Sequence, residues 1–458
     1  MSSLAETAGK RTMRLHTITL GCQMSAADGA EMSGPLYKRG FSAADSPQNA
    51  DAILINTCTV RQHAEDRAVS LIGSLKPWKN EDPNRVLIVT GCAAERLGEW
   101  IRKKFPHVDL IVGAKSIEQF PEIVEETLNR RFDALSENRE AFGACPGADA
   151  GLDKELFSSP VLGATAPGAP VADFVTIMRG CNYSCSYCIV PLVRGREHYR
   201  PVEDILEEAR RKTAAGVKEI TLLGQTVNSY SSTREGRKIN FSGLLELVDQ
   251  TPRLQRLRFM SPHPYYVDDR MIGAIARLRT VCELLHLPVQ SGSDRLLKLM
   301  RRNYTRDSYL QKVEKIRRAI AGVAISTDFI VGFPSETEEE FAQTLSLVEI
   351  LRPVCAYCFK YSPRESTESA AWPDDVPVRV KEERLERLNK LVDSMTATAL
   401  QEQIGKTLEV LSEQSNFGRT RDGFKVKWNA PAPIGERLPV KITAAAPRIL
   451  LGETADEI

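Results

Sequence analysis

Three cysteines stand together near the middle of this 458-residue chain, in the run Cys181-Asn-Tyr-Ser-Cys185-Ser-Tyr-Cys188. The run follows residues 174–178, an apolar stretch with the composition of a strand, so we place the cysteines on a loop at a strand end. Three thiolates on one short loop can converge on a cluster of soft metal ions, and a 4Fe–4S cluster held by three of them keeps one iron open. The alternatives are a structural zinc with a distant fourth ligand and cysteines that are simply buried. Because zinc sites usually contain C-x2-C pairs, the spacing favours the iron–sulfur cluster.

Composition narrows the class of protein without indicating a partner. The chain carries 61 Lys and Arg against 60 Asp and Glu, a net charge of +1 that gives no electrostatic sign of nucleic acid or membrane. No apolar run approaches the ~20 residues that span a bilayer, and the N-terminal stretch lacks the apolar core of a secretory signal. We therefore expect a cytoplasmic protein, in which ten cysteines indicate metal binding or catalysis rather than disulfides.

Length and periodicity divide the chain into several regions. Residues 13–131 alternate short β-rich runs with helical patterns, which predicts a small open α/β sheet as the first domain. Its expected strands are 15–20, 52–56, 86–90 and 108–112, and its expected helices include 64–75 and 117–128. Residues 133–172 are rich in Ala, Gly, Pro and Ser, the composition of a linker.

The alternation resumes with longer units over residues 173–403, the predicted core domain. Six strands are expected at 174–178, 219–223, 256–259, 283–287, 325–331 and 356–361, with helices at 202–214, 241–250, 269–276, 306–319 and 338–351. This order predicts a parallel sheet, either open or curled into an incomplete barrel. A further helix has one apolar face, formed by Leu385, Leu388, Val392 and Met395. Residues 404–453 contain short strands at 408–411, 424–428 and 438–442, which predict a small all-β domain.

A second trio of cysteines lies upstream. Cys22, Cys58 and Cys92 each follow a predicted strand of the first sheet, and each has a Gly or Thr immediately before it. In open α/β sheets, ligands gather outside the carboxyl ends of the strands. Isolated free cysteines are often simply buried, but the shared position of these three predicts a second three-thiolate site.

The triplet C-x3-C-x2-C, with the aromatic Tyr187 before its third cysteine, resembles the signature of the radical S-adenosylmethionine (SAM) superfamily. The resemblance implies a partial (β/α)6 barrel and a 4Fe–4S cluster on Cys181, Cys185 and Cys188. It also implies SAM on the open iron, one-electron reduction to a 5′-deoxyadenosyl radical, and Tyr187 among the cofactor-binding residues.

The pairing of the two trios resembles the methylthiotransferase family, and within it the MiaB branch. The similarity runs from about residue 13 to 452 and includes these blocks: Gly21-Cys22-Gln23-Met24, Asn56-Thr57-Cys58, Met178-Arg179-Gly180-Cys181-Asn182, Cys188-Ile189-Val190-Pro191, Arg194-Gly195-Arg196-Glu197, Leu285-His286-Leu287-Pro288 and Asp328-Phe329-Ile330-Val331-Gly332-Phe333-Pro334. The resemblance implies an N-terminal methylthiotransferase domain with an auxiliary 4Fe–4S cluster on Cys22, Cys58 and Cys92. It also implies that the C-terminal β domain is a TRAM-like domain that engages tRNA.

The implied enzyme is a transferase that uses two SAM molecules to add a methylthio group to C2 of N6-isopentenyladenosine at tRNA position 37. It needs an electron donor, flavodoxin- or ferredoxin-like, and a sulfur source, and it involves no membrane. The rival within the family acts on N6-threonylcarbamoyladenosine in tRNA or on a ribosomal-protein aspartate. The rival from another class is an iron–sulfur electron carrier, although carriers usually enclose each cluster with four thiolates.

Family position also nominates the SAM contacts. These are Gly224 and Gln225 near the methionyl amine, with Gln290, Ser291 and Asp328 nearby; catalytic residues beyond the cluster ligands are unknown. Arg194 and Arg196 are expected to meet tRNA phosphate or the SAM carboxylate, with a solvated surface pair as the alternative. Four cysteines have no assigned function: Cys282, Cys355 and Cys358 are expected to be buried and structural, and Cys145 lies in the linker. His286 is expected to be an interior, hydrogen-bonded histidine.

Overall fold

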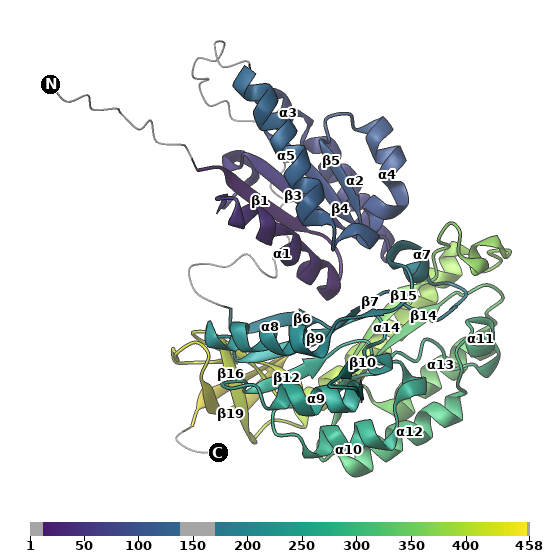
Figure 1. Ribbon diagram of the computed structural model, residues 1–458. Coiled ribbons are helices and arrows are strands. Elements are labelled where there is room, and N and C mark those ends of the chain that lie inside the picture. Colours follow the sequence, from purple (N-terminus) through teal and green to yellow (C-terminus); the bar gives the residue numbers. More distant parts are fainter. Residues whose placement is uncertain (1–11, 138–169, 456–458) are drawn as a thin grey trace. The chain divides into compact units, whose positions relative to one another are not determined.

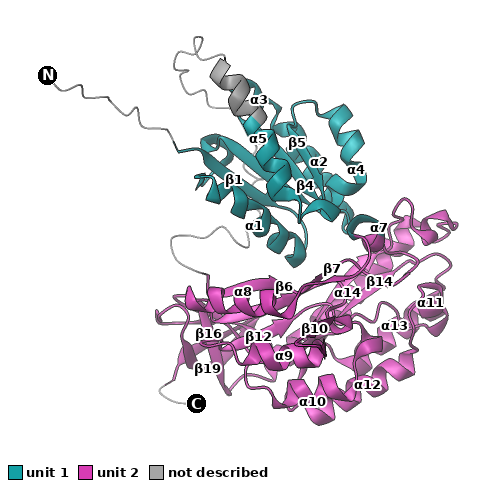
Figure 2. Cartoon of the chain, in the orientation of Figure 1, with its two compact units in different colours: residues 1–164, 192–194 teal, residues 165–191, 195–458 magenta. Residues whose placement is uncertain are grey.

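The computed structural model describes residues 12–137 and 170–455. The chain forms two compact units, which Figure 2 shows in different colours. Unit 1 comprises residues 1–164 and 192–194, and unit 2 comprises residues 165–191 and 195–458. Among the described residues, no helix has the length and apolar character needed to cross a membrane. Cys145 and most of the predicted linker fall outside the described residues.

Unit 1 is built on a five-stranded parallel sheet in the order β2-β1-β3-β4-β5. The strands are β1 (Arg14–Thr19), β2 (Ser42–Ala43), β3 (Ala52–Thr57), β4 (Val86–Gly91) and β5 (Leu110–Gly113). The helices are α1 (Gln23–Lys38), α2 (Gln62–Ser74), α3 (Lys76–Glu81), α4 (Cys92–Lys104) and α5 (Phe120–Glu137), with 3-10 turns at η1 (Pro47–Asn49) and η2 (Ala114–Ser116). Strands β3 and β4 are buried at every residue, which requires cover on both faces of the sheet. The predicted small open α/β sheet is confirmed.

Two helices of unit 1 have bounds that the sequence did not predict. Helix α5 extends to Glu137, past residue 128 and into the segment predicted as linker. Helix α1 fills a gap between two predicted strands, where a helix was expected without bounds, although Gly29, Gly34 and Pro35 disfavour a helix on local propensity. Packing on the sheet overrides that preference, since Met32 and Leu36 of this helix are 1% and 0% exposed.

Unit 2 contains six parallel strands that follow one another through the chain (Figure 1). They are β6 (Ala172–Thr176), β9 (Glu219–Leu223), β12 (Arg256–Phe259), β13 (Leu284–His286), β14 (Ala324–Val331) and β15 (Cys355–Lys360). Strands β6, β9 and β12 form one parallel set and β13, β14 and β15 another, and a parallel bridge between Leu257 and Val281 joins the two. The helices between them are α8 (Val202–Ala214), α9 (Phe241–Asp249), α10 (Asp269–Arg277), α11 (Asp294–Leu299), α12 (Arg306–Ala319) and α13 (Glu338–Leu351). One apolar core spans both sets of strands and helices α8, α9, α10, α12 and α13, so the predicted incomplete barrel is confirmed.

The strand expected at 174–178 is split in the structure. Strand β6 ends at Thr176, and Met178–Arg179 forms a separate strand, β7, that pairs antiparallel with β8 (His198–Tyr199). The next residue, Gly180, has φ +78°, and a Cβ there would lie 2.1 Å from the carbonyl oxygen of Arg196. Only glycine permits this approach, which closes residues 180–197 into a loop at the carboxyl end of β6. The remaining short elements are α7 (Val190–Arg194), η3 (Val227–Ser229), β10 (Ser231–Arg234), β11 (Arg237–Asn240), η4 (Pro264–Tyr266) and η5 (Glu368–Ala371).

The C-terminal part of unit 2 is β-rich. Helix α14 (Val378–Gln401) buries Leu388 and Val392 against the core, as its apolar face predicts. After it, five strands close into a small barrel: β16 (Thr407–Gln414), β17 (Phe417–Thr420), β18 (Lys425–Trp428), β20 (Ile449–Thr454) and β19 (Arg437–Ala446). Arg256 of β12 is fully buried and donates to the carbonyl oxygen of Arg419 at 2.5 Å, so the small barrel packs on the core within one unit.

Candidate active site

The cysteine loop of unit 2 lies at the carboxyl end of its first strand. Cys181, Cys185 and Cys188 are half-buried free thiols. The hydroxyl of Thr226, just past β9, lies 3.5 Å from the sulfur of Cys181. Arg302 donates from Nη1 to the sulfur of Cys185 at 3.4 Å. The loop therefore meets polar groups from two other segments at the same end of the sheet.

The unit 2 trio sits in a desolvated environment. Burial raises the pKa of the Cys181 thiol and raises that of Cys188 to about 12. Arg302 brings a permanent positive charge to this environment. Its Nε donates to the hydroxyl of Tyr304 at 2.8 Å and its Nη2 to the carbonyl oxygen of Pro288 at 3.2 Å. Because these partners are uncharged, the guanidinium can complement thiolates on the loop.

The residues predicted near the methionyl amine of SAM follow β9. A Cβ at Gly224 would lie 2.4 Å from the side chain of Met178, so glycine is required for the two segments to pack. The side-chain oxygen of Gln225 is buried without a hydrogen-bond partner among the described residues. A buried acceptor without a partner is unfavourable, and a ligand with N–H donors would satisfy it.

The other predicted SAM contacts lie at the ends of β13 and β14. Gln290 is 8% exposed and has φ +77°, a left-handed conformation that is uncommon outside glycine and recurs at binding sites. Its backbone accepts from Ile330 and donates to Asp328, both at 2.9 Å. Ser291 is fully buried, and its hydroxyl accepts from the amide of Ser293 at 3.2 Å, which stabilises the turn.

Asp328 and Tyr187 have partners within the protein. The Asp328 carboxylate lies 3.4 Å from Nε2 of His286, whose Nδ1 is 3.1 Å from the hydroxyl of Ser326. His286 is therefore an interior, hydrogen-bonded histidine, as predicted. Tyr187 packs edge-on against Phe333, with ring centroids 6.4 Å apart, and so anchors the cysteine loop to the apolar interior.

The upstream trio of unit 1 lies at the point where the sheet changes direction. Cys22 caps the start of α1 after β1, Cys58 directly follows β3, and Cys92 is the first residue of α4 after β4. Strands β1 and β3 are neighbours, and from them the chain runs outward to β2 on one side and to β4 on the other. Ligands of open α/β sheets bind outside the carboxyl ends of the strands at such a switch point.

Glycines bring the three strand ends of unit 1 close together. Gly21 has φ +140°, and a Cβ there would lie 2.5 Å from that of Cys58. Gly91 has φ +96°, and a Cβ there would lie 2.2 Å from Oδ1 of Asn56. The amide of Asn56 donates to the carbonyl oxygen of Ser25 at 2.6 Å, which ties α1 to β3. The Gly before Cys22 and before Cys92 is thus explained by close approach of the backbone.

A buried ion pair accompanies the unit 1 trio. Arg194, which belongs to unit 1, pairs with Asp28 at 2.6 Å, and their side chains are 5% and 0% exposed. A hydrogen bond with Cys58 lowers the pKa of Cys22 to about 5, with a smaller contribution from the Arg194 charge, and burial raises that of Cys92. The alternative that Arg194 and Arg196 form a solvated surface pair is wrong, because Arg194 is buried and pairs with a carboxylate in the interior, whereas Arg196 is exposed.

N–H donors lie beside the cysteines of both trios. Within the described ranges, no three or more His, Cys, Asp and Glu side chains are arranged to hold one metal ion. In a 4Fe–4S cluster each thiolate binds a different iron, so its ligands stand further apart than those of a zinc ion. Cluster sulfurs also accept N–H hydrogen bonds. Nη1 of Arg194, buried without a partner in the described part of the chain, and Nη1 of Arg302 at Cys185 are donors of this kind.

The cysteines outside the trios differ from one another. Cys282 is 1% exposed, as predicted. Cys355 is exposed and Cys358 half-buried, so the prediction that both are buried is wrong. The reason is topological: β15 is the edge strand of its set and pairs with β14 alone.

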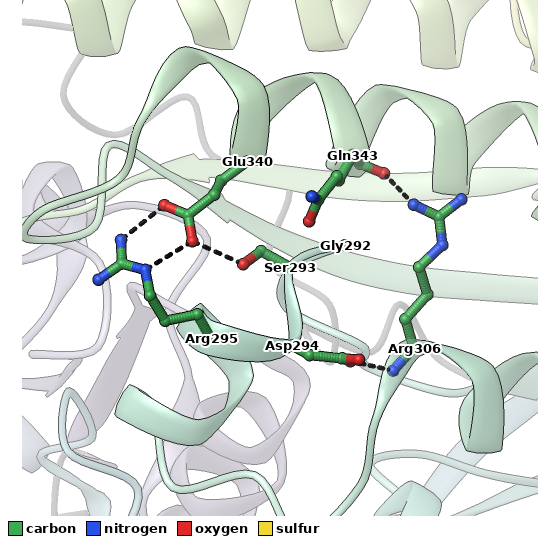
Figure 3. A pocket seen from close by; sticks show the side chains of 7 residues that line it. All are labelled: Gly292, Ser293, Asp294, Arg295, Arg306, Glu340 and Gln343. Carbon is green, nitrogen blue, oxygen red and sulfur yellow. Dashed lines mark hydrogen bonds and ion pairs between the residues drawn. The ribbon is translucent and has the colours of Figure 1, made fainter.

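A polar pocket of about 440 Å³ lies apart from the cysteine loop, between the segments that begin α11, α12 and α13 (Figure 3). Arg295 pairs with Glu340 at 2.6 Å, and Arg306 donates to the carbonyl oxygen of Gln343 at 3.0 Å. The charged groups Arg295 and Glu340 of this pocket therefore satisfy one another.

Sequence reasoning missed Arg302 and Thr226, which contact the unit 2 trio, and Asp28, which pairs with Arg194 in unit 1. Arg302 lies in an ordinary polar stretch, Met300-Arg301-Arg302-Asn303-Tyr304, which carries no recognisable signal. Asp28 lies in α1, a helix whose bounds the sequence did not give. Only the folding of distant segments onto the cysteine loops reveals these contacts.

Comparison with known proteins agrees with this arrangement. The model of the Radical SAM superfamily matches residues 175–348, and that of the Uncharacterized protein family UPF0004 matches residues 14–113. A solved structure, the radical SAM methyltransferase TsrM from Kitasatospora setae, superimposes with a TM-score of 0.53 at 13% identity, covering 78% of this chain and 77% of that one. At that identity the likeness shows the fold alone.

Relatives with much higher identity cover nearly the whole chain, and they are described as tRNA-2-methylthio-N(6)-dimethylallyladenosine synthases. The protein from Clostridium botulinum (strain Okra / Type B1) is 41% identical over 445 residues, covering 95% of each chain. The protein from Syntrophotalea carbinolica is 39% identical over 444 residues, covering 95% of this chain and 98% of the relative. The radical SAM methylthiotransferase resemblance is thereby confirmed: the chain belongs to the tRNA-2-methylthio-N(6)-dimethylallyladenosine synthase family of radical SAM enzymes.

Proposed function

We propose that this protein is a tRNA methylthiotransferase that converts N6-isopentenyladenosine at position 37, beside the anticodon, to its 2-methylthio derivative. The observation that carries the proposal is the presence of two three-cysteine sets, each at the carboxyl ends of parallel strands. The names of the near-full-length relatives supply the substrate. We assign residues 13–131 to the auxiliary-cluster domain, 173–403 to the radical SAM core and 404–453 to a TRAM-like domain.

Cys181, Cys185 and Cys188 would hold the first 4Fe–4S cluster. With SAM bound, this cluster supplies a 5′-deoxyadenosyl radical, which is needed because side-chain acids and bases are poorly suited to an unactivated aromatic C–H bond. Gln225 offers its free buried oxygen to an ammonium group, in line with its predicted place near the methionyl amine. Arg302 holds Cys185 and adds positive charge at the loop.

Cys22, Cys58 and Cys92 would hold the second 4Fe–4S cluster, which supplies the sulfur to be methylated. The buried guanidinium of Arg194 lowers the pKa of both Cys22 and Cys92 and so opposes the effect of burial on these thiols. Gly21 and Gly91 allow the strand ends to approach closely enough for the trio to form. Reducing equivalents would come from a flavodoxin- or ferredoxin-like protein and sulfur from a separate donor, in the cytoplasm.

Anaerobic reconstitution followed by an iron count and a product assay tests the proposal. About eight irons per chain correspond to two 4Fe–4S clusters. Incubation with SAM, a reductant and isopentenylated tRNA should then give a 2-methylthio nucleoside, identified by mass spectrometry. A gain of the same mass on threonylcarbamoyladenosine tRNA or on a ribosomal-protein aspartate, with none on isopentenylated tRNA, would move the protein to another branch of the methylthiotransferases.

A further inference from the structure

An aromatic cluster borders the cysteine loop of unit 2. Tyr183, inside the loop, stacks on the ring of His263, with centroids 4.1 Å apart and planes 15° from parallel. Tyr266 meets Tyr183 edge-on at 5.7 Å, and Tyr265 meets Tyr266 edge-on at 5.4 Å. Tyr265 and Tyr266 are 53% and 40% exposed within the described structure, in a turn at the carboxyl end of β12. We refer to Tyr183, Tyr265 and Tyr266 as the tyrosine platform.

The turn that carries the platform is held in place by side chains from other elements. Asn228 donates to the carbonyl oxygen of His263 at 2.9 Å and accepts from its amide at 2.8 Å. Lys312 of α12 donates to the carbonyl oxygen of Pro264 at 2.6 Å. Rings that are already ordered lose little conformational entropy when a ligand binds, so the platform is prepared for a planar ligand.

The buried histidine beneath the platform has a donor without a partner. The amide of Tyr265 donates to Nδ1 of His263 at 3.2 Å, so in the neutral ring the proton sits on Nε2. Burial, with the positive charges of Arg302 and Lys312, lowers the pKa of His263 to about 2 and keeps the ring neutral. His263 is 6% exposed, and its Nε2 has no hydrogen-bond partner among the described residues. A buried N–H in this situation needs an acceptor from a ligand.

We propose that the tyrosine platform stacks against the face of the adenine to be modified, with Nε2 of His263 as a donor open to the bound RNA. This inference deepens the proposed function and rests on it. The hydrogen to be replaced at C2 lies in the plane of the base, so an enzyme must hold the base by its faces and keep that edge open. Tyr183 satisfies this requirement beside the radical site, because its own amide donates to the sulfur of Cys181 at 3.4 Å.

The occupant is an unpaired nucleobase. Proteins hold single-stranded bases by stacking them on aromatic side chains and by hydrogen bonds to their exposed edges. A base within a duplex has no free face, so the base must leave its stack before the enzyme can act on it. An aliphatic partner would make no use of three aromatic rings and a free N–H donor.

Binding of an anticodon stem-loop RNA that contains isopentenyladenosine tests the proposal, with the reconstituted full-length protein and fluorescence anisotropy as the readout. Replacing Tyr266 or Tyr265 with Ala should weaken RNA binding about 5- to 150-fold, the range that the stacking of one base produces. Tyr266→Phe keeps the ring and should bind within about 2-fold of the wild type. The matched control is Trp100→Ala, which removes a ring that is 42% exposed on α4 and should leave RNA binding unchanged.

A second RNA, abasic at the target adenosine, locates the contact. The wild type should bind this abasic RNA as weakly as Tyr266→Ala binds the intact RNA. Tyr266→Ala should bind the abasic RNA and the intact RNA with the same affinity. Unchanged RNA binding by both alanine variants would overturn the proposal. If the alanine variants lost as much affinity for SAM as for RNA, the platform would belong to the cofactor site, and the proposal would also be overturned. A wild type that binds this RNA through the tyrosines but forms no methylthio product would contradict the proposed function and not the platform.

Discussion

The two cysteine trios are built in opposite ways. The unit 2 trio occupies a single loop, and its neighbours are an uncompensated guanidinium and uncharged polar groups. The unit 1 trio is assembled from three strand ends, and its neighbouring guanidinium is neutralised by the fully buried Asp28. The comparison teaches that local spacing alone brings three thiols together on one loop, whereas thiols at separate strand ends come together only through the packing around them. Substitutions near the ligands should therefore damage unit 1 more than unit 2.

The largest expected effect comes from removing one cysteine of either trio, because each trio should support a different step of the reaction. Cys185→Ala should abolish 5′-deoxyadenosine formation, because the radical site loses a ligand, and should halve the iron bound on reconstitution. Cys92→Ala should also halve the iron but leave 5′-deoxyadenosine formation in place while abolishing the methylthio product. The measurement is iron content together with chromatography of the SAM products. Radical formation by Cys185→Ala would refute the assignment of the unit 2 trio.

The buried ion pair offers the next largest effect. Asp28→Asn leaves the guanidinium of Arg194 buried without its counter-charge, which typically costs 3–5 kcal/mol. Hydrogen exchange of β3 peptides should show the loss of stability in unit 1, and iron should be lost from that unit alone. The control is Asp393→Asn, whose partner Arg448 is 73% exposed and whose pair should contribute less than about 1 kcal/mol. Equal effects of the two substitutions would mean that the Asp28 pair is not a buried one.

The third effect, which is smaller, comes from backbone crowding at the strand ends of unit 1. It is measured as the difference in stability cost between two Gly→Ala substitutions. Gly91 and Gly40 have similar φ angles, +96° and +93°, but a Cβ meets Asn56 at 2.2 Å in the first case and nothing within 4 Å in the second. Gly40→Ala should cost about 1–2 kcal/mol from its left-handed backbone alone. Gly91→Ala should cost more and reduce the iron bound by unit 1, as measured by reconstitution and chemical denaturation. Identical losses would show that the strand ends can separate without harm to the site.

The smallest effect concerns pH and His263, the buried histidine that stacks on Tyr183 of the unit 2 loop. The pKa of His263 is about 2 in the folded protein and about 6.5 in an unfolded chain. Below pH 6.5 the unfolded chain takes up a proton on this ring and the folded chain does not, so stability falls as the pH falls. Between pH 7.5 and 5.5 the loss should be about 1.4 kcal/mol. Urea denaturation at the two pH values should show this loss of unfolding free energy in the wild type and not in His263→Asn. The same change with pH in both proteins would contradict the pKa of His263 in the folded protein.

Much of the fold could be predicted because its local signals are consistent. Strands β9 and β12 and helices α8, α12 and α13 begin and end where the hydrophobic periodicity places them. The bounds of helix α1 could not be predicted, since Pro35 and two glycines oppose a helix that packing on the sheet stabilises. The exposure of Cys355 could not be predicted either, because it depends on β15 having a neighbour on one side only.

The sequence by itself determined the two trios of cysteines, the family and the order of the folded regions, because spacing along one loop and residues after successive strands are local properties. Only the tertiary structure decided what surrounds the thiols. Arg302 and Thr226 reach the unit 2 loop from distant segments, and Asp28 neutralises Arg194 across 166 positions of the chain. The charge and burial around a thiol depend on which segments the fold brings to it, and that is a property of packing rather than of spacing.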